Sequence, residues 1–112
     1  MRLAALLEVQ PETIGVLPNP VSTGDFTAVD GAGRGRDSLL WVGSLREHRD
    51  LDVLLRSVAE LRASRPGVRL QLVGDERHPG DRSRLEALTR ELHLGGTVNF
   101  VGWLDRSEVA LL

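Results

Sequence analysis

The sequence predicts an α/β fold built on a parallel β-sheet, and two observations carry that prediction. From residue 38 onward, short apolar runs alternate with longer segments whose apolar residues recur at helical spacing. Strands that alternate with helices of this length imply right-handed βαβ crossovers and hence a parallel sheet. Each apolar run also ends at a glycine, namely Gly43, Gly74 or Gly102.

The first 37 residues are expected to be a connection rather than a packed unit. Residues 3–9 predict a short helix, and Thr13–Leu17 is a short strand candidate that Pro18 stops. Residues 22–37 are rich in Gly, Ser, Thr and Asp and predict a loop. The run Gly31–Gly35 lacks a preceding strand and a following helix, so it does not qualify as a phosphate-binding loop.

The first strand and helix follow this connection. Leu39–Val42 is a continuous apolar run, which is typical of a strand buried on both faces. Leu51 to about Ser64 carries apolar residues at helical spacing and predicts a helix. Asp50 or Asp52 can interact with its positive N-terminus, and Pro66-Gly67 stops it.

The second strand and helix repeat the arrangement. Residues 68–73 alternate between apolar and polar side chains and predict a strand. Asp81 is the expected start of the next helix, with Ser83 and Glu86 at capping-box spacing as a second possible start. Its buried stripe is expected to contain Leu85, Leu88 and Leu92, and Gly95-Gly96 is expected to end it.

The third strand is predicted at Thr97–Gly102. Asp105, with Glu108 three residues on, predicts the start of a last helix that runs to Leu112. In open parallel sheets, ligands bind outside the carboxyl ends of the strands. Glycine at those ends allows a sharp turn and a close approach of backbone amides to a ligand. The three strand-end glycines are therefore expected to share one binding edge.

Composition excludes several classes of function. The net charge is −2, with 14 basic side chains, all of them Arg, against 16 acidic ones. A general nucleic-acid binder needs an excess of positive charge, so we expect no nucleic-acid partner. The absence of Cys excludes disulfides and thiolate metal sites, and the three isolated His do not form a metal site. No run approaches the roughly 20 apolar residues of a membrane span, and we expect a cytoplasmic protein.

Five short motifs in a fixed order resemble the family 4 glycosyltransferases of the GT-B fold. They are VLPNPVSTGDF at residues 16–26, WVGSL at 41–45, LQLVGD at 70–75, LEAL with LHL between 85 and 94, and VNFVG at 98–102. Each motif is weak alone, whereas their order and spacing together are specific for the family. They do not identify the sugar, the nucleobase or the acceptor.

The resemblance implies a domain organisation. Residues 1–37 correspond to the interdomain connection and linker, and 38–112 to part of the C-terminal, Rossmann-like donor-binding domain. The implied fold is a three-layer parallel sheet, truncated relative to half of a GT-B enzyme. The N-terminal domain and the catalytic glutamate pair of the family are expected outside these residues, the glutamates beyond Leu112. No catalytic residue is therefore assigned, and the fragment alone is expected to be inactive.

The resemblance also implies a reaction. Family members transfer a sugar, here of the hexosyl type, from a nucleoside diphosphate to an acceptor with retention of configuration. No cofactor or metal is expected, so cations and amide dipoles must stabilise the departing diphosphate. Peripheral attachment of a full-length enzyme to the inner face of the membrane would depend on the missing domain.

The diphosphate-binding candidates follow the first strand. They are Gly43, Ser44, Arg46 and Arg49. Ser44 stands where the family has an Arg, Arg49 lies near the position of the family's Lys, and Arg46 is a possible substitute on the same loop. Arg can bind phosphate in a bidentate manner, so Arg49 is chemically compatible with this role.

The nucleotide-binding candidates follow the second and third strands. They are Gly74, Asp75, Trp103 and Leu104. Two of them have a plain alternative, because Asp75 also suits a turn and Trp103 also suits a partly buried position at a domain edge.

Two other hypotheses for the function of the chain stay open at this point. One is a catalytically inactive remnant or interaction module with a degenerate donor site, which Ser44 at the usual Arg position favours. The other is a receiver or flavodoxin-like domain, which is disfavoured because no acidic pair follows the first strand. With a truncated sheet, we also expect an open edge and a tendency to associate.

Overall fold

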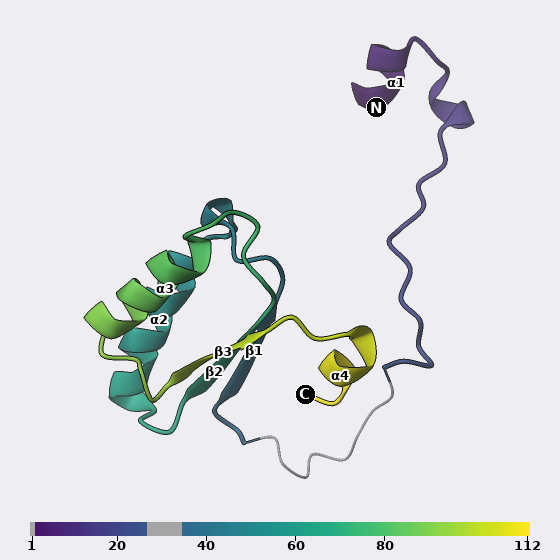
Figure 1. Ribbon diagram of the computed structural model, residues 1–112. Coiled ribbons are helices and arrows are strands. Elements are labelled where there is room, and N and C mark those ends of the chain that lie inside the picture. The colour runs from purple at the N-terminus through teal and green to yellow at the C-terminus, as the bar shows by residue number, and fades with distance from the viewer. Residues whose placement is uncertain (1, 27–34) are drawn as a thin grey trace.

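The computed structural model describes residues 2–26 and 35–112, which contain one three-stranded parallel sheet (Figure 1). Its strands are β1 (Ser38–Val42), β2 (Arg69–Val73) and β3 (Val98–Gly102), in the order β1-β2-β3. All the pairings are parallel, as the alternation of strands and helices predicts. The register of β2 with β3 shifts between Leu72 and Val73.

Helices lie on both faces of this sheet. α2 (Leu51–Ser64) and α3 (Asp81–Glu91) pack on one face, and α4 (Arg106–Ala110) lies on the other (Figure 1). The predicted α/β, Rossmann-like arrangement in three layers is therefore confirmed. The core lies between the sheet and α2 with α3, and its buried members are Leu45, Leu51, Leu55, Val58, Val68, Leu70, Leu72, Leu85, Leu88, Leu94 and Val98.

The helix ends agree with the sequence in part. α4 starts with a complete capping box, in which Asp105 and Glu108 exchange side-chain to backbone hydrogen bonds as predicted. α3 starts at Asp81 and not at Ser83. It ends at Glu91 rather than at Gly95-Gly96, because the chain already turns away at His93, which has a φ of 57°.

The prediction that the first strand is buried on both faces was wrong. Leu39, Leu40 and Val42 are exposed, and only Trp41 of the apolar run is half-buried against the core. The reason is position, since β1 is an edge strand that pairs with β2 alone in the described part of the chain.

The N-terminal segment extends away from the sheet (Figure 1). It contains α1 (Arg2–Leu7) and a short 3-10 helix at Pro11–Thr13. The predicted strand at Thr13–Leu17 does not form, because these residues have no strand beside them among those described. The extension raises the radius of gyration to 18.7 Å, against about 13 Å for a compact chain of this size.

Two further observations concern the described residues alone. Half of the predicted loop at 22–37, residues 27–34, lies outside them, and the described remainder contains no helix or strand, as predicted. None of the helices within 2–26 and 35–112 is both long and apolar enough to cross a membrane.

Candidate functional site

The carboxyl ends of the three strands are joined into one rim by backbone hydrogen bonds. The Gly43 amide donates to the carbonyl of Val73 over 2.9 Å, and the Gly74 amide donates to the carbonyl of Gly102 over 2.7 Å. One step further out, the Leu45 amide donates to the carbonyl of Asp75 over 3.0 Å. The three strand-end glycines therefore lie side by side, as expected for one binding edge.

Glycine is required at this rim for two reasons. Gly74 and Gly102 have φ values of 138° and 87°, a backbone region that residues with a Cβ rarely adopt. Gly74 also packs directly against the carbonyl group of Gly43, which leaves no room for a side chain. The glycine at the end of β2 thus allows the close approach of the first two strand-end turns.

A hollow of about 410 Å³ opens above this rim. Its size falls within the range of roughly 300 to 1,000 Å³ that is usual for small-molecule sites. Trp103 is one of the residues that line the hollow, and 69% of its surface is exposed. The full lining is Val42, Gly43, Ser44, Val73, Gly74, Asp75, Glu76, Arg77, Trp103 and Leu104.

All the nucleotide-binding candidates predicted from the sequence line this hollow. These are Gly74, Asp75, Trp103 and Leu104, which come from the loops after β2 and β3. Residues distant in the sequence are thus brought together where a ligand in a parallel sheet is expected. Whether they bind a nucleotide stays a prediction.

The diphosphate-binding candidates divide into two groups. Gly43 and Ser44 line the hollow, whereas Arg46 and Arg49 are not part of its lining. The chain enters a short 3-10 helix at Glu47–Arg49 and then a left-handed turn at Asp50, which has a φ of 52°. The Nε atom of Arg46 is buried and has no hydrogen-bond partner among the described residues.

Two charged residues of the lining were not singled out in the sequence. Glu76 and Arg77 directly follow Gly74-Asp75 in the loop between β2 and α3. Their position in the sequence could have identified them, since any residue just after a strand-end glycine can reach the binding edge of a parallel sheet.

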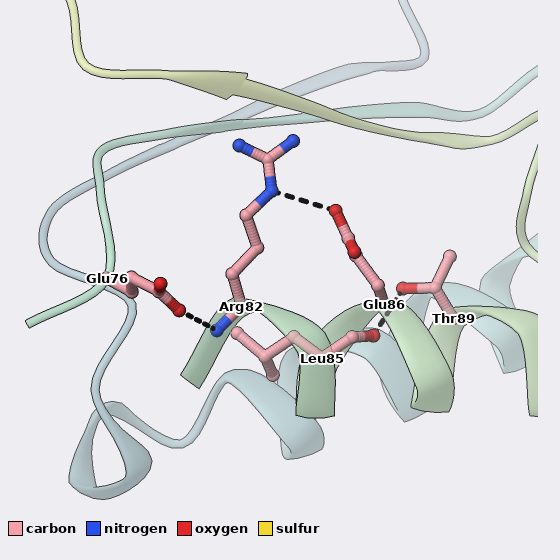
Figure 2. A network of polar contacts seen from close by, with 5 residues as sticks. All are labelled: Glu76, Arg82, Leu85, Glu86 and Thr89. Atoms are coloured by element: carbon pink, nitrogen blue, oxygen red, sulfur yellow. Dashed lines mark hydrogen bonds and ion pairs between the residues drawn. The ribbon is translucent and has the colours of Figure 1, made fainter. Parts of the chain in front are cut away.

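Glu76 is held by the first turn of α3 (Figure 2). Its Oε2 accepts the backbone amide of Arg82 over 3.0 Å. This amide is one of the donors that a helix leaves unpaired at its N-terminus, where a negative charge is also favourable. In contrast to its backbone amide, the side chain of Arg82 donates from Nε to the Glu86 carboxylate over 2.8 Å. Its guanidinium lies 5.7 Å from the centre of the Phe100 ring.

The loop after β3 is fixed by the start of α4. The Asp105 carboxylate accepts the Ser107 hydroxyl over 2.6 Å and the Glu108 amide over 2.9 Å. The hydrogen bond from Ser107, followed by that from Glu108, lowers the pKa of Asp105 below its usual value. Asp105 therefore acts as a helix cap directly after Trp103 and Leu104.

No metal-binding cluster accompanies the hollow in the described part of the chain. Among residues 2–26 and 35–112, no group of three or more His, Asp or Glu side chains is placed to hold a metal ion.

Comparisons with known proteins bear on the fold and on the family. Among solved structures, the apo form of the lipopolysaccharide outer core galactosyltransferase WaaB is similar to the chain, with a TM-score of 0.66 and 23% identity. The match covers 98% of this chain and 30% of that one, and at this identity it shows the fold. A comparison with curated protein sequences gives no match. The family model described as "Glycosyl transferases group 1" matches residues 27–112, and the chain therefore belongs to the group 1 glycosyltransferases.

Proposed function

We propose that this chain binds the nucleoside-diphosphate part of a sugar donor, as part of a retaining family 4 glycosyltransferase of the GT-B type. The observation that carries the proposal is the rim in which Gly43, Gly74 and Gly102 lie side by side, with Gly43 and Gly74 lining one hollow next to Trp103. The chain spans 30% of the length of the galactosyltransferase that it matches. The hexosyl transfer, the acceptor and the contribution of a further domain are therefore parts of the same proposal.

The nucleoside would occupy the side of the hollow formed by the loops after β2 and β3. The exposed indole of Trp103 offers a flat surface on which a base can stack. The Asp75 carboxylate, which lies beside Gly102, can accept hydrogen bonds from ribose hydroxyls.

The diphosphate would lie over the turn after β1. Cleavage of the bond to the sugar leaves negative charge on the departing diphosphate, and fixed backbone amides can stabilise it there. Gly43 lets the backbone approach the phosphates, and Ser44 adds a hydroxyl donor. We propose that neither a metal nor another cofactor takes part.

A second function is supported by one observation. Ser44 replaces the Arg of the family pattern, and neither Arg46 nor Arg49 lines the hollow. This arrangement would suit a catalytically inactive remnant or an interaction module with a degenerate donor site. The two proposals differ in whether the hollow binds a nucleoside diphosphate at all.

Calorimetric titration tests the proposal. The chain would be titrated with uridine, adenosine, guanosine and thymidine diphosphates in the presence of EDTA. We expect saturable binding of at least one of them, whereas an absence of binding by all of them would support the degenerate site.

A matched pair of variants locates the binding. Trp103→Ala is expected to weaken binding about tenfold, since stacking of a base on an aromatic ring contributes roughly 1–3 kcal/mol. Leu17→Ala removes a side chain that is 92% exposed and far from the hollow in the sequence, and it should leave the affinity unchanged.

A further inference from the structure

We propose that Arg77 supplies the positive charge for the diphosphate, and that Glu76 is a positioning residue that holds it there. This inference rests on the proposed function. It differs from the expectation of the sequence, which gave this role to Arg46 and Arg49 on the preceding loop.

Charge is unevenly distributed around the hollow. Among the described residues of its lining, Arg77 is the only one with a positively charged side chain. Within the described part of the chain it forms no ion pair, since the three ion pairs found there involve Arg65, Arg82 and Arg106. Its guanidinium is therefore not engaged by a carboxylate of the described residues, and its five N–H donors match the oxygens of a phosphate.

Of the two carboxylates in the lining, those of Asp75 and Glu76, the Glu76 carboxylate is already engaged. Glu76 lines the same hollow, and an unsatisfied carboxylate there would repel a diphosphate. Its Oε2 instead accepts the Arg82 amide at the start of α3, an 11-residue helix (Figure 2). The positive end of the helix partly compensates the carboxylate.

The backbone is fixed on both sides of Arg77. Before it, the Asp75 carbonyl accepts the Leu45 amide over 3.0 Å, which ties the loop to the turn after β1. After it, the His78 amide donates to the Asp81 carboxylate over 3.1 Å, which ties the loop to the start of α3. A cation on a fixed backbone loses less conformational freedom on binding than one on a mobile loop.

The test compares the affinities of three probes for the intact chain by calorimetry. The probes are a nucleoside diphosphate that binds, the corresponding nucleoside and inorganic pyrophosphate. For Arg77→Gln we expect roughly ten- to hundredfold weaker binding of the diphosphate, because hydrogen bonds to charged groups have this worth. Nucleoside affinity should stay within about twofold of the unmodified chain, and the loss of diphosphate affinity with added salt should become shallower.

Two variants serve as controls for the loss of the positive charge at Arg77. Arg84→Gln removes the same charge from the exposed first turn of α3, outside the lining, and should leave all three affinities unchanged. Arg77→Lys keeps the charge and should recover part of the diphosphate affinity.

The outcomes separate this inference from the proposed function. If no nucleoside diphosphate binds the unmodified chain, both are overturned. If the diphosphate binds and Arg77→Gln matches Arg84→Gln, the role of Arg77 is overturned while the proposed function stands. Equal weakening of nucleoside and diphosphate would likewise overturn the charge-based role.

The positioning role of Glu76 has its own readout. Glu76→Ala should weaken diphosphate binding. Glu76→Gln should retain the diphosphate affinity of the unmodified chain, because the amide oxygen of Gln can still accept the Arg82 amide. Unchanged diphosphate affinity in Glu76→Ala would overturn the positioning role.

Discussion

A Cβ atom on Gly74 would lie 1.7 Å from the carbonyl oxygen of Gly43. The ends of β1 and β2 are therefore in backbone contact, and their separation is set by the absence of one side chain. Gly43 and Gly74 both line the hollow, so a substitution at Gly74 is expected to change both the stability of the fold and the shape of the site.

Substitution of Gly74 by Ala should be strongly destabilising. The clash adds to the strain of a positive φ, so we expect a loss of at least about 2 kcal/mol in the free energy of unfolding. Gly80→Ala, with a φ of 99° but open space around it, should show the strain alone. Gly95→Ala meets neither obstacle and should stay within about 0.5 kcal/mol of the unmodified chain. Urea denaturation measures the free energy of unfolding of the three variants. Equal values for Gly74→Ala and Gly95→Ala would refute the predicted effect of the clash and the strain.

The core between α2 and the sheet should dominate the stability. Leu55 on α2 is 0% exposed, whereas Val53 on the same helix is 56% exposed. Leu55→Ala is expected to lower the free energy of unfolding by about 2–5 kcal/mol, since it leaves a cavity in a packed interior. Val53→Ala serves as the control and should lower it by much less. A similar urea midpoint for both variants would mean that the core is not where the structure places it.

The cap at α4 should depend on pH. Hydrogen bonds from Ser107 and Glu108 stabilise the charged carboxylate of Asp105, which lowers its pKa in the folded chain. The stabilisation is thus complete above the ordinary pKa of an aspartate and is lost as the pH falls through the lowered value. Carboxyl chemical shifts should show a titration midpoint for Asp105 below that of an unstructured Asp. Ser107→Ala should raise the midpoint, and no change in this variant would disprove the assigned cause.

The open edge of the sheet should promote association. β1 carries no charged residue and no Pro along Ser38–Val42, and such edges tend to pair with other strands. Sedimentation velocity should therefore show an average mass that rises with protein concentration. Leu40→Lys, at a residue that is 45% exposed, should reduce this rise, whereas Val53→Lys should not. A concentration-independent monomer would argue against an adhesive edge.

Most of the fold was predictable from the sequence because helices, caps and strand ends depend on residues that are close together in the chain. The helical spacing within Leu51–Ser64 and the cap at Asp105 depend on neighbouring residues, and both appear as predicted. The exposure of Leu39 and Leu40 depends on which strand lies at the edge of the sheet, and their apolar run alone does not carry that information.

The placement of the candidate residues was predictable in part, whereas their role in binding stays a prediction. Glycines at strand ends are visible in the sequence, and the parallel topology brings them together. That Arg77 lines the hollow and Arg46 does not depends on how each loop leaves its strand, which the residue types of the two loops do not specify.

Mapping of amide chemical shifts during titration with a nucleoside diphosphate tests the account most directly. If the rim binds the diphosphate and Trp103 the base, saturable shifts are expected at Gly43, Gly74 and Asp75 and at the indole N–H of Trp103. Gly95 and Gly96, which precede β3 at the amino ends of the strands, should not shift. Shifts at the amino ends with none at the rim, or no saturable shifts at all, would contradict it.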